Sequence, residues 1–212
     1  SWHDLVILSA TLVVGAFVAK CPLENVLHSA GFIKNGSATL ISGSPYAGKS
    51  NLTFHAWSRG YQILGDDWLF YGPGLPEVFP IPKPLSPRIV AKELGIYAAK
   101  CNSNPYHFGK LRDENRLMIG RSNGFYNSWE KPARIGEIVF IEKSQDEHSS
   151  IREIRAKQAL PMLLAQTITR KADISLQGVK FAETIAKESI PFFQMKLGKD
   201  GFEQGFDLLS SV

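Results

Sequence analysis

The sequence predicts an α/β fold, in which a mixed β-sheet is flanked by helices and carries a phosphate-binding loop. The chain has 212 residues, of which 44% are hydrophobic and 21% charged, and this is enough for one domain with a buried core. A strand, a glycine-rich loop and a helix follow one another over residues 37–59, and a second strand comes directly after them. We therefore expect a single P-loop domain over residues 1–212, with residues 1–22 as an N-terminal extension of its core.

The first elements have clear local signals. Asn35-Gly36 is typical of a tight hairpin turn, and residues 37–42 read as the strand that follows it. Residues 50–59 have a helical pattern, and Gly60 is suited to end the helix. Residues 61–65 then read as a second strand, which ends at two aspartates.

Further along the chain the signals are more mixed. Residues 71–88 contain six prolines, which predicts an extended connector poor in helix and in central strand. The other expected elements are loops with short strands over 100–133, a strand over 138–141, a helix over 151–170 that Pro161 kinks or divides in two, a strand over 192–197 and a closing helix around Asp207.

Charge and cysteine content exclude several classes of function. The 24 basic residues are spread among 20 acidic ones, for a net charge of +4, so we expect no nucleic-acid partner, while a small polyanion remains compatible. Cys21 and Cys101 are too few for a disulfide framework and form no zinc motif. We expect both to be thiols of a reduced, cytoplasmic protein.

An apolar stretch covers residues 5–19. It is short for a membrane span, and it resembles the apolar part of a signal peptide. Asp4 precedes it, however, and no basic segment does. We therefore expect a buried helix or strand and no membrane span.

The motif with the most chemical content runs from Gly43 to Ser50 and fits the pattern G-x-x-x-x-G-K-[ST]. Its glycines let backbone N–H groups curl around a phosphate, and the helix N-terminus adds positive charge. Lys49 would reach the β- and γ-phosphates, and the Ser50 hydroxyl would bind Mg²⁺. The alternative is a glycine-rich turn with a chance Lys-Ser pair. The predicted nucleotide-binding residues are Gly43, Ser44, Pro45, Tyr46, Ala47, Gly48, Lys49, Ser50 and Asn51.

A second constellation is Asp66-Asp67, at the end of the strand over 61–65. If this strand runs parallel to the strand over 37–42, both strands end at the same edge of the sheet. One carboxylate could then bind Mg²⁺ and the other could take a proton from an attacking hydroxyl. The alternative is a polar turn after a strand.

The spacing of these residues resembles that of bacterial HPr kinase/phosphorylase and its kinase relatives, which share a phosphoenolpyruvate-carboxykinase-like P-loop fold. His28 lies fifteen residues before Gly43, an Arg-Gly pair follows at 59–60, and Asp66 lies sixteen residues after the loop serine. The resemblance covers roughly residues 23–70 well, and the strand that begins at Glu137 also resembles the short-kinase branch of the family.

The resemblance implies an ATP- and Mg²⁺-dependent kinase that acts on a hydroxyl. Asp66 would be the acid/base residue, and Asp67 and Ser50 would serve the metal, although the two aspartates could exchange roles. His28 would lie near the transferred phosphate or orient a carboxylate. Short relatives include the kinases that phosphorylate a serine of lasso peptide precursors, so a peptide or protein serine is the expected acceptor. The family also implies a homo-oligomer.

Two departures from the family narrow this expectation. The stretch Lys92-Glu93-Leu94-Gly95-Ile96 stands where the family has a Glu-x-Arg-Gly-x-Gly-Ile loop, and it lacks the Arg-Gly pair. That loop serves the protein substrate HPr and the reverse phosphorolysis, so we expect neither here. The loop segment Pro45-Tyr46-Ala47 is also bulkier than usual, and Tyr46 could cover the nucleotide or shield the loop.

Phosphoryl transfer also needs positive charge near the equatorial oxygens, which arginine supplies well. We predict Arg134 for this role because it leads into the strand over 138–141; the other candidates are Arg88, Arg116, Arg121 and Arg170.

The sequence as a whole predicts transfer of the γ-phosphoryl group of ATP to a serine hydroxyl of a peptide or protein. The alternatives are a small-molecule kinase with an acceptor such as serine, an NTPase whose acceptor is water, and a degenerate module that binds nucleotide or peptide without turnover.

Overall fold

The computed structural model of the chain describes residues 26–72, 74–81, 85, 87–88, 131–168 and 176–212, together with the backbone of 106–111 and 114–119. The apolar stretch 5–19, both cysteines, residues 92–96, Arg121 and Arg170 lie outside the described residues. So does most of the segment 100–133, in which β7 (Tyr106–Leu111) and β8 (Glu114–Ile119) form the expected short strands as an antiparallel pair.

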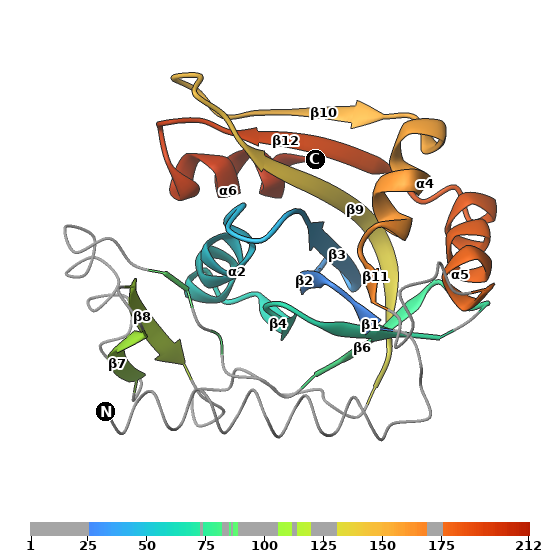
Figure 1. The fold of residues 1–212 in the computed structure, drawn as a ribbon, viewed down its shortest axis with the longest axis horizontal. Helices are drawn as coiled ribbons and strands as arrows, with labels where there is room; N and C mark the ends of the chain where they lie inside the picture. The colour runs from blue at the N-terminus through green and yellow to red at the C-terminus, as the bar shows by residue number, and fades with distance from the viewer. Residues whose placement is uncertain are drawn as a thin grey trace.

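A mixed sheet organises the molecule (Figure 1). Its strands follow one another in space in the order β11-β1-β5-β6-β9-β3-β2-β4; off this path, β12 pairs with β9, and β10 pairs with β12. The strands are β1 (Val26–Leu27), β2 (Ser29–Lys34), β3 (Ser37–Ser42), β4 (Gln62–Gly65), β5 (Leu69–Tyr71), β6 (Glu77–Pro80), β9 (Ala133–Lys143), β10 (Ser150–Ile154), β11 (Thr167–Ile168) and β12 (Phe192–Leu197).

The long strand β9 joins the two halves of this sheet. It runs parallel to β3 and to β12, and its first two residues pair antiparallel with β6. The remaining neighbours are antiparallel. The predicted mixed sheet is therefore confirmed.

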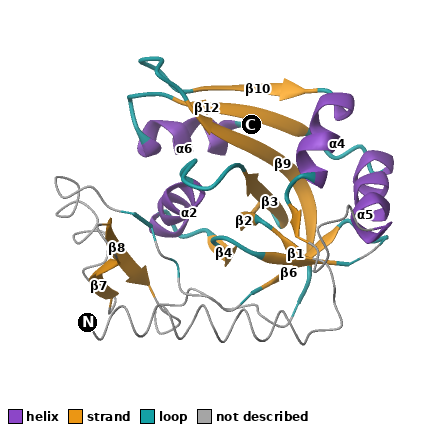
Figure 2. Ribbon diagram, viewed as in Figure 1, coloured by secondary structure: helices purple, strands orange, loops and turns teal. Residues whose placement is uncertain are grey.

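Helices cover both faces of the sheet (Figures 1 and 2). On one face, α2 (Lys49–Ser58) and α6 (Phe202–Ser211) pack on Ile41, Val139 and Ile141. On the other face, α4 (Ala156–Leu164) and α5 (Leu176–Lys187) pack on the alternate strand residues, such as Leu40, Ile138 and Phe140. This alternation follows from the two-residue period of a strand that is buried on both faces.

Turn chemistry fixes the β2–β3 hairpin and the end of α2. Asn35 and Gly36 have φ values of 52° and 81°, the left-handed pair that a tight hairpin requires. After α2, Gly60 has a φ of 86°. Its N–H binds the Trp57 carbonyl at 2.9 Å, and the next N–H binds the Ala56 carbonyl at 3.1 Å, as in a Schellman motif.

The proline-rich segment contains an element that the sequence did not predict. Residues 77–80 form β6, which lies between β5 and β9 inside the sheet. The expected extended connector, poor in helix and in central strand, thus includes one short central strand that the sequence did not indicate. Proline is tolerated because Pro80 is the last residue of β6 and lies beyond its two pairs with β9.

The predicted helix over 151–170 was also too long. Residues 150–154 form β10, the helix is confined to 156–164, and residues 167–168 form β11. Pro161 lies inside this single helix, where it removes one backbone donor. The strands at both ends are fixed by pairing with β12 and β1, which no local pattern reveals.

A buried ion pair closes the end of the sheet at which β2 finishes. Lys34 and Glu137 are both almost fully buried, and their charged atoms are 2.9 Å apart. Thr39 donates a hydrogen bond of 2.6 Å to the same carboxylate oxygen. The Lys34 ammonium also donates to the carbonyls of Leu209 and Val212, at the end of α6. These contacts fix the C-terminal end of α6 to the sheet.

Among the residues that the structure describes, no helix has the length and apolar character needed to cross a membrane.

Candidate functional site

The strand directions bring three separate segments to one edge of the sheet. β2 runs antiparallel to both β3 and β4 and lies between them, so β3 and β4 point the same way although they are not neighbours. The carboxyl ends of β3 and β4 therefore meet the start of β2. The expectation that the strand over 37–42 and the strand over 61–65 end at the same edge is confirmed, and His28, which precedes β2, joins them there.

The glycine-rich loop, residues 43–48, links β3 to α2. Gly43 approaches β9 so closely that a Cβ atom would lie 2.6 Å from the Ile141 carbonyl oxygen. Gly48 has a φ of 111°, and a Cβ there would lie 2.4 Å from the Phe202 ring. Both positions therefore require glycine for steric reasons. The hydroxyl oxygens of Ser29 and Ser42 lie 2.5 Å apart, and this hydrogen bond joins the start of β2 to the end of β3.

The beginning of α2 presents positive charge to the loop. The first amides of a helix have no acceptor within the helix, and no acidic residue lies in the first turn of α2. Lys49 is buried, and its ammonium donates to the carbonyls of Gly43 (2.8 Å) and Ser44 (3.2 Å). The loop thus holds its lysine in place, and the end of the helix can bind an anion.

Two carboxylates and an imidazole come from the same edge of the sheet. Asp66 is buried, whereas Asp67 has a side chain that is 34% exposed. The Nε2 atom of His28 lies 3.1 Å from Oδ1 of Asp67. This contact is compatible with the expectation that His28 orients a carboxylate, and its position relative to a transferred phosphate stays a prediction.

These groups line one cavity of about 290 Å³, whose lining residues are His28, Pro45, Tyr46, Gly48, Lys49, Ser50, Asn51, Asp66, Asp67 and Arg88. The cavity thus combines the helix terminus, the lysine and the carboxylates in one space. Gly43, Ser44 and Ala47, also predicted for nucleotide binding, form the loop but do not line the cavity. Ala47 is buried, and its N–H binds the Ser44 carbonyl at 3.2 Å.

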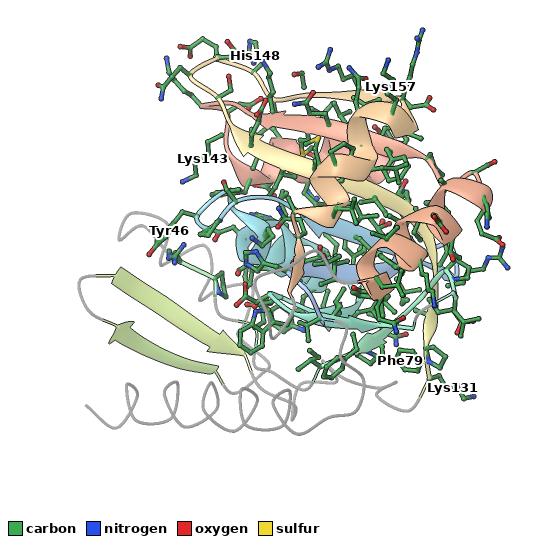
Figure 3. All side chains as sticks on the ribbon, turned by 45° about the vertical axis from the view of Figure 1, so that its right-hand side comes forward. Tyr46, Phe79, Lys131, Lys143, His148 and Lys157 are labelled. Atoms are coloured by element: carbon green, nitrogen blue, oxygen red, sulfur yellow. The ribbon has the colours of Figure 1, made fainter. Side chains whose placement is uncertain are left out.

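The arginine of the cavity is Arg88, not Arg134. Arg134 is the second residue of β9, and because β9 is parallel to β3 its first residues lie at the sheet edge opposite the loop. Figure 3 shows this separation: Lys143, at the end of β9, lies on the side of Tyr46, and Lys131, just before β9, lies at the far end. The Arg134 guanidinium binds Glu188 at 2.5 Å.

Sequence reasoning named Arg88 as a candidate but did not prefer it. It comes to the cavity because Asn51 Nδ2 donates to its carbonyl oxygen at 2.9 Å, a contact that leaves no trace in local sequence. Arg116 lies in β8, of which only the backbone is described.

The oxygen donors of the cavity suit Mg²⁺. Nucleotide sites hold this ion with one or two protein oxygens and the substrate phosphates, and Ser50 and Asp67 offer a hydroxyl and a carboxylate in the same cavity. Within the described part of the chain, no group of three or more His, Cys, Asp or Glu side chains could hold a metal ion by itself.

No protein-family model matches the sequence, and no curated protein matches it in a sequence search. Among solved structures, the chain is similar to the HPr(Ser) kinase/phosphatase from Coxiella burnetii, with 11% sequence identity and a TM-score of 0.41 over 88% of this chain and 94% of that chain. A likeness this distant carries no functional conclusion, so the function has to be inferred from the cavity itself.

Proposed function

We propose that this chain is a P-loop phosphotransferase that binds ATP with Mg²⁺ and transfers the γ-phosphoryl group to a hydroxyl acceptor. The proposed acceptor is a serine of a peptide or protein, such as a precursor of the lasso peptide kind. One observation carries the proposal: the glycine-rich loop with Lys49 and Ser50 shares a single cavity with Asp66, Asp67 and His28. A phosphate site alone would suit any nucleotide-binding protein, whereas adjacent carboxylates also supply a base for an acceptor.

Each side of the cavity has its own task. Lys49 and the first amides of α2 bind and orient phosphate oxygens. Mg²⁺, when bound, neutralises phosphate charge, and Ser50 and Asp67 would hold it. His28 keeps the Asp67 carboxylate in one orientation through the 3.1 Å contact.

Asp66 is the proposed proton acceptor at the serine hydroxyl. The oxygen of that hydroxyl forms the new bond to phosphorus, the bond from phosphorus to the leaving oxygen of ADP breaks, and the hydroxyl proton moves to the Asp66 carboxylate. Burial of Asp66 keeps water away from the carboxylate, and most of the acceleration comes from positioning and electrostatics.

The test is transfer of label from [γ-³²P]ATP·Mg²⁺ to serine-containing peptides, free serine and HPr, with Asp66→Asn compared with wild type. We expect serine phosphorylation that falls by about 10²–10⁴-fold in Asp66→Asn, the usual contribution of general acid–base catalysis. Nucleotide affinity should change little. The matched control is Asp146→Asn, which removes a carboxylate from the exposed turn after β9, where that carboxylate accepts a hydrogen bond from the Ser144 hydroxyl.

Three results would contradict the proposal in different ways. Label released only as inorganic phosphate would indicate an NTPase. Tight nucleotide binding without turnover for any acceptor would indicate a binding module. Full transfer by Asp66→Asn would leave the kinase intact but remove Asp66 as its base, and Asp67→Asn would then be the next variant.

A further inference from the structure

An arginine–tyrosine stack forms part of the wall of the cavity. The Cζ atom of Arg88 lies 3.8 Å from the centroid of the Tyr46 ring. Both residues line the cavity, and Tyr46 is 59% exposed. Figure 3 shows the Tyr46 side chain projecting away from α2. The stack therefore lies where the cavity meets solvent.

Arg88 is held by the segment that forms the phosphate end of the cavity. Its side chain stacks on Tyr46, in the glycine-rich loop, and its carbonyl accepts the hydrogen bond from Asn51, in the first turn of α2. Two residues of one short segment thus fix an arginine that lies 37 positions after Asn51. A side chain held in this way loses less conformational entropy when it binds a ligand.

Tyr46 has an unfavourable backbone conformation at the position where its ring contacts Arg88. Its φ of 70° is in the left-handed region, which glycine adopts readily and large side chains rarely do. Backbone strain of this kind concentrates at functional sites, where the surrounding structure maintains it. Glycine would relieve the strain but would leave Arg88 without an aromatic face.

The stack also suits the chemistry of a phosphate. Stacking occupies the flat face of the guanidinium, whereas its N–H donors lie around the edge and match two phosphate oxygens at once. Lys49 and the helix terminus supply positive charge at the loop. A phosphate that extends from them toward Asp66 and Asp67 meets two carboxylates. Mg²⁺ would offset part of this negative charge, and Arg88, which lines the same cavity, is a further cation for the phosphate.

We propose that Arg88 contacts the terminal phosphate of a bound nucleoside triphosphate and that Tyr46 is the positioning residue that holds its guanidinium. This inference depends on the proposed function, because it assumes a nucleotide in the cavity. It adds that the cavity distinguishes a triphosphate from a diphosphate by means of this arginine.

The test is calorimetric binding of Mg²⁺ complexes of adenylyl imidodiphosphate and ADP, and of AMP, to the full chain. Arg88→Ala should weaken the triphosphate analogue by about 10-fold or more and ADP by less than about threefold, because one charge-assisted contact is lost. Tyr46→Ala should give a smaller loss with the same selectivity, and Tyr46→Phe should retain wild-type binding because the ring face remains. The matched control is Arg152→Ala, which removes an exposed arginine from β10.

The variant Lys49→Ala separates failure of this inference from failure of the proposed function. If Lys49→Ala leaves binding of both nucleotides unchanged, the phosphate site itself is wrong. If Lys49→Ala weakens both but Arg88→Ala affects them equally or not at all, only the role of Arg88 is overturned. If Tyr46→Ala weakened binding of the triphosphate analogue, ADP and AMP equally, the ring would stack on the base. That result would also overturn the inference.

Discussion

The two edges of the central strands both carry buried charge, but they use it differently. Where β2 ends, the Glu137 carboxylate binds Lys34 and Thr39, and the Lys34 ammonium also binds the last carbonyls of α6. Where β2 begins, Lys49, Asp66 and Asp67 line a cavity of about 290 Å³. The charged groups at the first edge bind each other and join α6 to the sheet. Those at the second edge face a cavity that a ligand can enter.

This difference shows why burial of a charged residue does not by itself indicate function. Glu137 and Asp66 are both buried, at 8% and 2% exposure. Of the two, only Asp66 borders a cavity that is also lined by the Lys49 ammonium and the N-terminus of α2. If the two edges are independent, a substitution at the Lys34 edge should change the free energy of unfolding and leave nucleotide affinity unchanged.

The largest expected effect is on stability, from Lys34→Met. The change leaves the Glu137 carboxylate buried without its cation and removes the donor to the end of α6. We expect a loss of about 3–5 kcal/mol in the free energy of unfolding, the usual cost of breaking a buried pair. Urea unfolding measures this loss.

The companion measurement for Lys34→Met is nucleotide affinity under conditions in which the variant remains folded. Affinity should stay at the wild-type level because the cavity lies at the other edge. The double variant Lys34→Met, Glu137→Gln should recover part of the lost stability. A stability loss below about 1 kcal/mol would show that the pair contributes less than buried pairs usually do.

Gly48→Ala should damage both properties, and Gly60→Ala is its control at the other end of α2. Both glycines have positive φ, but a Cβ at Gly60 meets nothing within 4 Å, whereas at Gly48 it would lie 2.4 Å from Phe202. Gly60→Ala should therefore cost only the backbone term of about 1–2 kcal/mol. Gly48→Ala should cost more and should also weaken nucleotide binding. Equal unfolding free energies for the two variants would show that the Phe202 ring moves aside.

Ser149→Ala tests the Asp200 carboxylate, which lies at the loop edge of the sheet but stabilises the fold and does not line the cavity. The Ser149 hydroxyl and N–H both bind the Asp200 carboxylate, at 2.6 and 2.8 Å, and these hydrogen bonds, the hydroxyl first, hold its pKa below the usual 3.8. A lowered pKa in the folded state stabilises the protein above the unfolded pKa, and this contribution is lost as pH falls through the folded value. Ser149→Ala should therefore cost about 0.5–1.5 kcal/mol at pH 7.

The pH dependence of this cost is its check. Chemical unfolding of Ser149→Ala and wild type at pH 7 and below the usual pKa of 3.8 should show the difference between them shrinking at the acidic end. A difference that is constant with pH would mean that the serine stabilises the turn without the Asp200 charge, through its contact with the Gly198 N–H.

The smallest effect is expected from Arg134→Ala. Its partner Glu188 and the guanidinium are both exposed, at 38% and 67% of the side chain, and such pairs contribute less than about 1 kcal/mol. Thermal unfolding should show little change. A large loss of phosphate transfer in this variant, with the fold intact, would restore the sequence-based prediction of a catalytic Arg134.

Local patterns predicted the part of the fold that local chemistry determines. The Asn35-Gly36 turn, the glycine-rich loop and the stop at Gly60 are each fixed by backbone conformation, so their residues are visible in the sequence. The meeting of the loop with Asp66 was predicted from strand direction, and the structure has it with β2 between the two strands.

What the sequence missed depends on distant partners. β6 forms only because β5 and β9 pair with it, and β10 only because β12 does. Arg88 reaches the cavity through a contact with Asn51, and its neighbours in sequence predict only a connector. Arg134 was preferred because it precedes a strand, but parallel pairing places that end of the strand away from the loop.

The insertion of β2 between β3 and β4 also bears on the order of folding. Every described residue that lines the cavity falls within residues 28–88, and the pairs among β2, β3 and β4 join segments close in sequence. The pairing of β3 with β9 instead joins residues about a hundred positions apart, such as Thr39 and Glu137. Contacts between nearby segments form with a smaller loss of chain entropy. Pairing among β2, β3 and β4 therefore costs less chain entropy than the pairing of β3 with β9, and the loop still needs β9 and α6 for the close contacts of Gly43 and Gly48.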